Sequence, residues 1–192
     1  MKSNINKQFP SFLSNTIPNP KERKRIIVYV ALTACVVAAG ITLIALNYQS
    51  SLLVDEDTYK GFFKQFGSVS RIIYFIVFCI FPVFQLLKWK GLRRVKWRNL
   101  EIKGLVQEAG RLLRKWHVPL ALLATTGVIF HVILAVMISF QWNFTNITGI
   151  LTSMVLCFVV FMGFRRFKRK DGAWHLKLAV TFTVMFMIHA SF

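Results

Sequence analysis

The sequence predicts an all-α integral membrane protein: a five-span helical bundle with its N-terminus inside and its C-terminus outside. Three observations predict this. The 192 residues are 55% hydrophobic, with a mean hydropathy of +0.53. The apolar residues are gathered in long runs. The 25 Lys and Arg, against 7 Asp and Glu, stand in blocks between those runs. Such blocks are typical of cytoplasmic loops and do not indicate a nucleic-acid-binding face.

A polar, basic cytoplasmic tail is expected over residues 1–25, and the membrane domain over residues 26–192. The first apolar run follows the basic residues 21–25 and shows no small-x-small cleavage site at its end. We therefore expect a retained anchor and not a cleaved signal peptide.

Five runs are long enough to cross a hydrocarbon core about 30 Å thick, which takes roughly 20 helical residues. The expected spans cover residues 26–46, 69–87, 118–140, 147–164 and 174–192. Pro82 lies inside the second span, where neighbouring helices can satisfy the carbonyl that a proline leaves without a donor.

An amphipathic inner connection, residues 88–116, joins the second span to the third. Asn99 is a candidate helix cap there. The tryptophans of this connection are expected to anchor it in the inner interface; they are Trp89, Trp97 and Trp116.

Lys and Arg counts predict the orientation. The N-terminal tail holds six, the 88–115 connection ten and the 165–170 connection five, so 21 of the 25 lie on one side if all five runs span. That side is expected to be the cytoplasm, and the membrane is expected to be the plasma (cytoplasmic) membrane. The basic blocks are expected mainly to set topology, with membrane lipid as their partner.

Cys35, Cys79 and Cys157 each lie inside an apolar run, and no Cys-x-x-Cys spacing occurs. A zinc site, an iron–sulfur cluster and covalent c-type haem attachment are therefore unsupported. We expect three small buried apolar side chains.

The chain has four histidines, and their spacing is duplicated. The interval from His117 to His131 equals the interval from His175 to His189, fourteen positions in each case. Fourteen helical residues return to within about 40° of the starting direction and rise about 21 Å, so each pair shares one helix face at two depths. The shift that brings His117 onto His175 also aligns Trp116 with Trp174 and Thr125 with Thr183, which makes this an internal repeat.

The topology predicts how the four histidines pair. The third and fifth spans run in the same direction, so His117 and His175 enter at the inner side, and His131 and His189 lie toward the outer side. Two imidazoles at equal depth can supply both axial nitrogens of one iron. The sequence therefore predicts two haem b groups, one above the other. A proton relay, a di-metal site and ordinary helix–helix hydrogen bonding are the alternatives.

Haem propionates need cations or hydrogen-bond donors. The candidate propionate partners are Arg111, Arg114, Lys115 and Lys177 on the inner side and Arg71 on the outer side. Asn143, Thr145 and Ser191 are further candidate donors on the outer side. Gly127 is a position where a macrocycle could approach, or one that only allows close helix packing.

Two haems held by two co-directional helices with one helix between them resemble the ferric reductase-like transmembrane domain. That family includes NADPH oxidases, yeast-type ferric reductases and the bacterial membrane partner of the periplasmic methionine sulfoxide reductase. The resemblance covers about residues 70–192 and is specific at His117, His131, His175 and His189. It implies electron transfer across the membrane, from an inner haem to an outer haem and then to an external acceptor.

The family usually has six spans, whereas five are expected here. The sequence also shows no Gly-rich dinucleotide fingerprint and ends at Phe192, so the electron donor is expected to be a separate flavoprotein or a membrane quinol. The alternatives are a quinone-linked di-haem cytochrome b subunit of a larger complex and a non-redox membrane scaffold. No nucleophile–base arrangement or carboxylate pair indicates any other catalysis.

Overall fold

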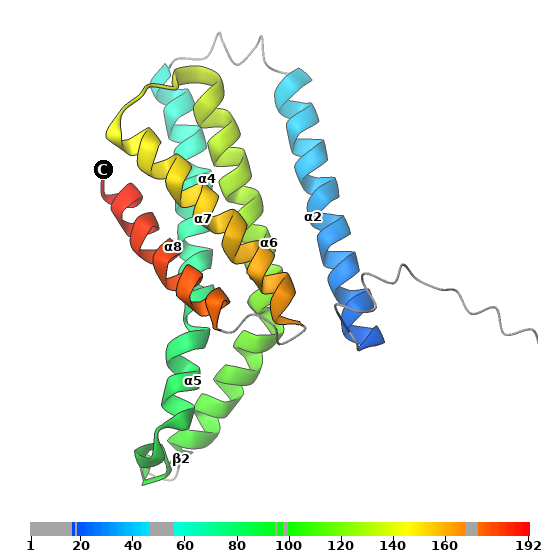
Figure 1. Ribbon diagram of the computed structural model, residues 1–192, viewed down its shortest axis with the longest axis vertical. Coiled ribbons are helices and arrows are strands. Elements are labelled where there is room, and N and C mark those ends of the chain that lie inside the picture. The colour runs from blue at the N-terminus through cyan, green and yellow to red at the C-terminus, as the bar shows by residue number, and fades with distance from the viewer. Residues whose placement is uncertain (1–16, 18, 47–55, 95, 98–99, 168–172) are drawn as a thin grey trace, which may run out of the picture. The chain divides into compact units, whose positions relative to one another are not determined.

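The computed structural model describes residues 17, 19–46, 56–94, 96–97, 100–167 and 173–192. Almost all of this is helix, in agreement with the predicted all-α class (Figure 1). The helices are α2 (Pro20–Leu46), α4 (Glu56–Phe78), α5 (Ile80–Lys88), α6 (Ile102–Ser139), α7 (Phe144–Arg166) and α8 (Trp174–Ser191). A 3-10 helix, η1 (Lys90–Arg94), and two short strands, β1 (Lys96–Trp97) and β2 (Leu100–Glu101), lie between α5 and α6.

Four helical stretches among the described residues are long and apolar enough to cross a membrane. They are Pro20–Leu46, Thr58–Lys88, Ile102–Met137 and Phe144–Arg166. The fifth expected span corresponds to α8, which has only 18 residues and carries His175, Lys177 and His189. These polar side chains lower its mean hydropathy, so α8 does not stand among the four.

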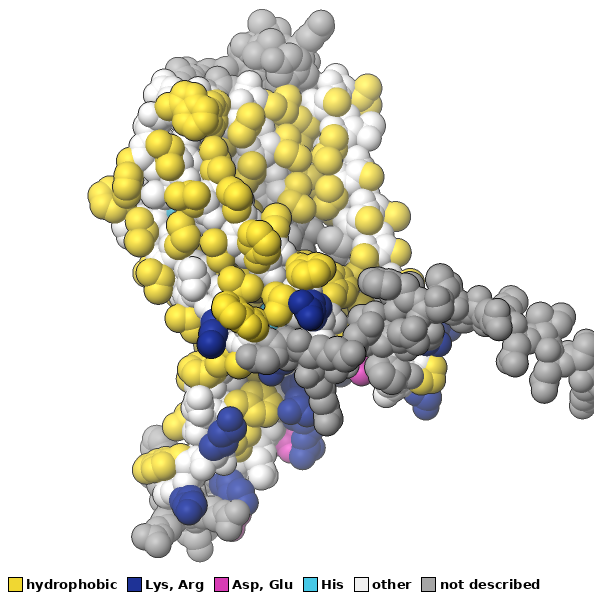
Figure 2. All heavy atoms as spheres, viewed as in Figure 1, with side chains coloured by type: hydrophobic (Ala, Val, Ile, Leu, Met, Phe, Trp, Pro, Cys, Tyr) yellow, Lys and Arg dark blue, Asp and Glu magenta, His cyan; other side chains and the backbone are white. Residues whose placement is uncertain are grey.

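The helices present large apolar side chains outward, as a lipid-facing surface requires. Leu43 of α2 is 61% exposed, and Phe158 and Phe161 of α7 are 57% and 59% exposed. Figure 2 shows such side chains covering much of the visible surface. The three cysteines are also exposed. The expectation that they are buried is therefore wrong: Cys35 and Cys157 lie on outward faces of α2 and α7, and Cys79 lies between α4 and α5.

Several helices begin or end away from the predicted span limits. α2 begins at Pro20, and not at residue 26, because the side chain of Asn19 accepts a hydrogen bond from the backbone N–H of Lys21 at 3.0 Å. Proline is well suited to the first helical position, where its missing N–H costs no helical bond. The expected polar tail therefore becomes helical before it becomes apolar.

The second span is broken at Cys79, between α4 and α5. Pro82 cannot donate to the carbonyl of Phe78, which is the helical acceptor four residues before it. The helix is interrupted at the next residue and resumes when Val83 N–H donates to the Cys79 carbonyl at 3.3 Å. α4 also starts at Glu56, well before the predicted limit of residue 69.

The third span and much of the predicted inner connection form one helix, α6, of 38 residues. At 1.5 Å per residue α6 is about 57 Å long, nearly twice the thickness of a hydrocarbon core. Trp89 and Trp116 of the connection are 58% and 47% exposed. Asn99, the expected cap, lies outside the described residues.

By its internal contacts the chain divides into two units: Met1–Val28 with Ser139–Phe192, and Tyr29–Ile138. In the first, α7 and α8 pack as an antiparallel pair. In the second, α4 packs antiparallel to the later part of α6, and α5 packs beside its first turns (Figure 1). The β1–β2 pair, with Lys96 opposite Glu101, connects these last two elements.

The α4–α6 contact is close because small side chains lie in it. Ser70 is 2% exposed and Ala124 is fully buried. The Ser70 hydroxyl occupies the space that a side chain at Gly127 would need. Gly127, expected as a position where a macrocycle could approach, is therefore filled by α4 in this structure. Close packing through small residues is typical of membrane helices.

Candidate functional site: histidines against helix backbones

The four predicted histidines lie on two helices, as the spacing indicates. His117 and His131 belong to α6, and His175 and His189 to α8. The two helices fall in different units, so the pairing of His117 with His175 and of His131 with His189 stays a prediction. What the structure describes is how each histidine is held within its own unit.

The two histidines of α8 are held by α7 in the same way. Nδ1 of His175 lies 3.2 Å from the carbonyl oxygen of Val159. Nδ1 of His189 lies 3.0 Å from the carbonyl oxygen of Thr145. The interval from Thr145 to Val159 equals the interval from His175 to His189. The spacing of the histidines on α8 is therefore matched by an equal spacing of their acceptors on α7.

A glycine lies under each of these imidazoles. A Cβ added at Gly163 would come 3.4 Å from Cε1 of His175, and one added at Gly149 would come 2.9 Å from Cε1 of His189. The two glycines are separated by the same interval as the histidines, and each lies one helical turn after the residue whose carbonyl accepts the hydrogen bond. Glycine lets the ring approach the α7 backbone closely enough for Nδ1 to reach that carbonyl.

These contacts determine which ring nitrogen carries hydrogen. A carbonyl oxygen can only accept a hydrogen bond, so Nδ1 is the donor in both His175 and His189. In a neutral imidazole the lone pair is then on Nε2. Imidazoles that bind metals are commonly held in this way, by donation of the other ring N–H to a backbone carbonyl. The residues present therefore fit an axial role for Nε2 of His175 and of His189.

The histidines of α6 have different surroundings. A Cβ added at Gly67 of α4 would come 3.1 Å from Nδ1 of His131, so this imidazole also lies over a glycine of a neighbouring helix. His117 lies shortly before Pro119, the proline inside α6, and its Nδ1 is buried. Thus three of the four imidazoles lie on a helix backbone at a glycine.

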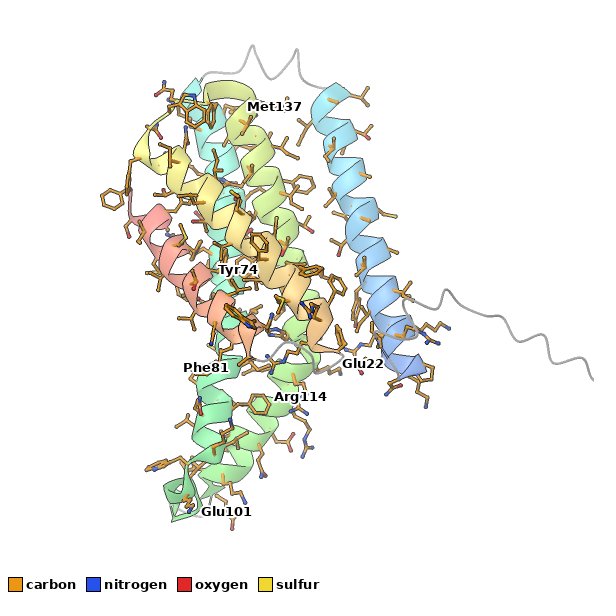
Figure 3. The ribbon with its side chains drawn as sticks, viewed as in Figure 1. Glu22, Tyr74, Phe81, Glu101, Arg114 and Met137 are labelled. Carbon is orange, nitrogen blue, oxygen red and sulfur yellow. The ribbon has the colours of Figure 1, made fainter. Side chains whose placement is uncertain are left out.

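Between the two histidines of α6, Tyr74 of α4 bonds to Thr125. The two hydroxyl oxygens are 2.9 Å apart, and Thr125 also donates to the Ala121 carbonyl at 2.7 Å. Tyr74 is 4% exposed. It lies along the α4–α6 pair between the levels of Met137 and Arg114 (Figure 3).

The internal repeat extends to the threonines. Thr183 of α8 donates to the Ala179 carbonyl at 2.8 Å, as Thr125 of α6 does to the Ala121 carbonyl. The interval from Ala121 to Ala179 and the interval from Thr125 to Thr183 both equal the interval from His117 to His175. The repeat therefore holds in side-chain conformation as well as in sequence.

The five predicted propionate cations are exposed and have varied surroundings. Arg111 pairs with Glu108 at 3.1 Å, Arg114 lies over the ring of Phe84 at 5.1 Å, and Lys177 lies over the ring of Trp174 at 5.0 Å. Lys115 and Arg71 are exposed on α6 and α4. Figure 2 shows Lys and Arg side chains gathered over α5 and the first turns of α6. A propionate role for these residues stays a prediction.

The outer-side candidate donors have structural partners. Asn143 caps α7, because its side chain accepts from the backbone N–H of Asn146 at 2.8 Å. Thr145 contributes its backbone carbonyl to His189, and the Ser191 hydroxyl donates to the Met187 carbonyl at 2.7 Å. Sequence reasoning missed Gly149 and Gly163, although their separation was visible beside the equal separation of the histidines.

No group of three or more His, Cys, Asp or Glu that could hold a metal ion by itself occurs among the described residues. A haem brings four nitrogen ligands of its own, so an axial pair of imidazoles completes its iron. In comparisons with known proteins, no protein-family model, no curated protein and no solved structure matches this chain.

Proposed function

We propose that this chain is the membrane subunit of a reductase that carries electrons across the plasma membrane through two stacked bis-histidine b haems. The observation that supports this most is the duplicated arrangement on α7 and α8. The two imidazoles of α8 each donate Nδ1–H to a backbone carbonyl beside a glycine of α7. In both, donation from Nδ1 leaves the lone pair of the neutral imidazole on Nε2, the atom that would bind an iron.

Ordinary helix–helix hydrogen bonding accounts less well for this arrangement. A histidine that only joins two helices needs one polar contact, and that contact can lie at any depth in the membrane. Here the histidines of α8 and the glycines of α7 beneath them repeat with one spacing, and the same spacing separates His117 from His131. A repeated ligand at two fixed depths explains why one interval recurs on three helices.

The proposed topology has five spans, with α8 as the fifth and the basic segments in the cytoplasm. Bound haem iron would supply reversible one-electron transfer at each level. The chain's own residues hold the imidazoles in one tautomer and orientation, and the apolar helices exclude water around them. A reduced flavin or quinol on the cytoplasmic side would give up two electrons, one at a time, with its protons released on that side. Two equivalents of a one-electron acceptor on the outer side would be reduced.

The first experiment measures haem in the purified full-length protein. A dithionite-reduced minus air-oxidised spectrum, with haem and protein quantified together, should show low-spin b-type bands and two haems per chain. An absence of haem after expression with haem supplied would refute the proposal and leave a proton relay or a scaffold.

A set of double variants tests the pairing. Replacing His131 and His189 together by Leu should leave one haem per chain, because both substitutions remove the same site. Replacing His117 and His175 should also leave one. Replacing His131 and His175 should leave none, because one ligand of each iron is lost. Val184→Leu, at an exposed position of α8, is the matched control and should keep two.

A further inference from the structure

His189, the second histidine of α8, has a threonine hydroxyl of α7 beside its ring. Oγ1 of Thr148 lies 3.4 Å from Nδ1 of His189, in addition to the Thr145 carbonyl at 3.0 Å. Thr148 directly precedes Gly149, and the residue that directly precedes Gly163, the glycine under His175, is Met162. A methionine has no hydroxyl, and its sulfur is only a weak acceptor. The outer imidazole therefore has a second oxygen beside it, at a position where the inner level has a methionine.

The hydrogen bonds of Thr148 indicate which partner donates. Its hydroxyl has one hydrogen, which is directed to the carbonyls of Phe144 and Thr145, both at 2.9 Å. The remaining lone pairs of Oγ1 are available to Nδ1–H of His189. Thr148 is 8% exposed, so water competes little for these groups. Nδ1–H of His189 thus faces two oxygen acceptors.

A second acceptor changes the electronic character of the ring. Oxygen lone pairs that draw on Nδ1–H make Nε2 a stronger base, and a more basic ligand stabilises the oxidised metal. Hydrogen bonding around the ligands is one of the means by which a protein sets the potential of haem iron. From this geometry we infer that Thr148 is a positioning residue that lowers the reduction potential of the outer haem. The inference rests on the proposed function.

The test is a potentiometric titration of the haem-loaded protein. The variants are made in the background in which His117 and His175 are both Leu, so that only the outer haem is present. Thr148→Val removes the hydroxyl with little change of shape. It should raise the equilibrium constant for reduction of the outer haem about threefold to tenfold, which is about 28 to 59 mV for one electron.

Two controls separate this effect from a loss of packing. Thr148→Ser keeps the hydroxyl and should keep the potential of the parent. Thr152→Val removes another buried hydroxyl of α7, one that donates to the Thr148 carbonyl and is 5% exposed, and should leave the potential unchanged. An unchanged potential in Thr148→Val, or an equal shift in Thr148→Ser or Thr152→Val, would overturn the inference.

A variant at the inner level keeps the inference testable if Thr148→Val does not fold. Met162→Thr places a hydroxyl at the matching position and should lower the potential of the inner haem, measured where His131 and His189 are both Leu. An inner potential that stays the same or rises would overturn the inference. Failure of the proposed function looks different, since the unaltered protein would then bind no haem.

Discussion

The carbonyl oxygen of Thr145 on α7 accepts a hydrogen bond from Nδ1 of His189 on α8 at 3.0 Å. This contact joins the first turn of one helix to the last turn of the other. The acceptor that orients the imidazole is a backbone carbonyl, so the orientation depends on where the α7 backbone lies and not on the side chain of residue 145. Whatever moves the first turn of α7 or the backbone at Gly149 should change the outer site.

Substituting the glycines beneath the α8 histidines should impair the two levels unequally. Gly149→Ala places a Cβ 2.9 Å from Cε1 of His189 and should remove most of the outer haem, because the ring must move from its acceptor. Gly163→Ala, at 3.4 Å from His175, should be tolerated better. Haem per chain measures both. Gly104→Ala, which meets nothing within 4 Å, is the control, and a loss of haem equal to that of Gly149→Ala there would contradict the explanation.

The glycine beneath His131 offers a separate test of the pairing. Gly67→Ala places a Cβ 3.1 Å from Nδ1 of His131 and should reduce the same haem as Gly149→Ala. The double variant should therefore retain one haem per chain, as His189→Leu does. A haem content near zero in the double variant would mean that the two glycines support different sites. Gly61→Ala, on the same helix with open space around it, is the matched control.

The hydroxyl pair between α4 and α6 should contribute modestly to stability. Tyr74→Phe removes the bond to Thr125 and should cost about 0.6 kcal/mol, the average for side-chain hydrogen bonds between membrane helices. Thr125→Val should cost a similar amount, and the double variant should cost less than the two together because one bond is lost. Reversible unfolding in mixed detergent measures all three. Full additivity would show that the pair is not coupled.

The cap of α7 should influence the outer histidine through the helix. Asn143→Ala removes the side chain that accepts from Asn146 N–H and should destabilise the first turn by about 1 kcal/mol. That turn holds the Thr145 carbonyl, so the outer haem should dissociate faster while the inner haem is unaffected. Asn143→Asp keeps an acceptor and should restore retention. Haem transfer to a soluble acceptor protein measures the rate at which each haem dissociates. Equally fast loss of haem from both levels would contradict a specific effect of the cap on the outer haem.

The sequence predicted the helical class and the helix that carries each histidine, because long apolar runs and a repeated histidine interval are local signals. The residues at which the helices begin and end were predicted less well. The interruption at Cys79 depends on Pro82 and on whether neighbours restore the lost bond, which a proline in a sequence does not reveal. The start of α6 at Ile102 depends on the first turns packing on α5, where Gly110 lies against Val83 and Leu87.

The supporting half of the candidate site was not predicted for a different reason. The acceptors of His175 and His189 are backbone carbonyls, and every residue has one, so Val159 and Thr145 carry no distinguishing signal. The glycines do carry one. In an antiparallel pair the residue numbers of facing positions have a constant sum, and Gly163 with His175 gives the same sum as Gly149 with His189. That relation needs the pairing of α7 with α8, which a single sequence does not provide.

The matched spacing on α7 and α8 has a consequence for the lengths of these helices. Deleting one residue between Gly149 and Gly163 would turn one glycine about 100° away from its histidine while leaving the other in place. A compensating deletion between His175 and His189 would restore the register. Neither helix can therefore change length alone between the two levels without losing one of them. The contacts between α7 and α8 therefore fix the distance between the two imidazoles along the helix axis at about 21 Å.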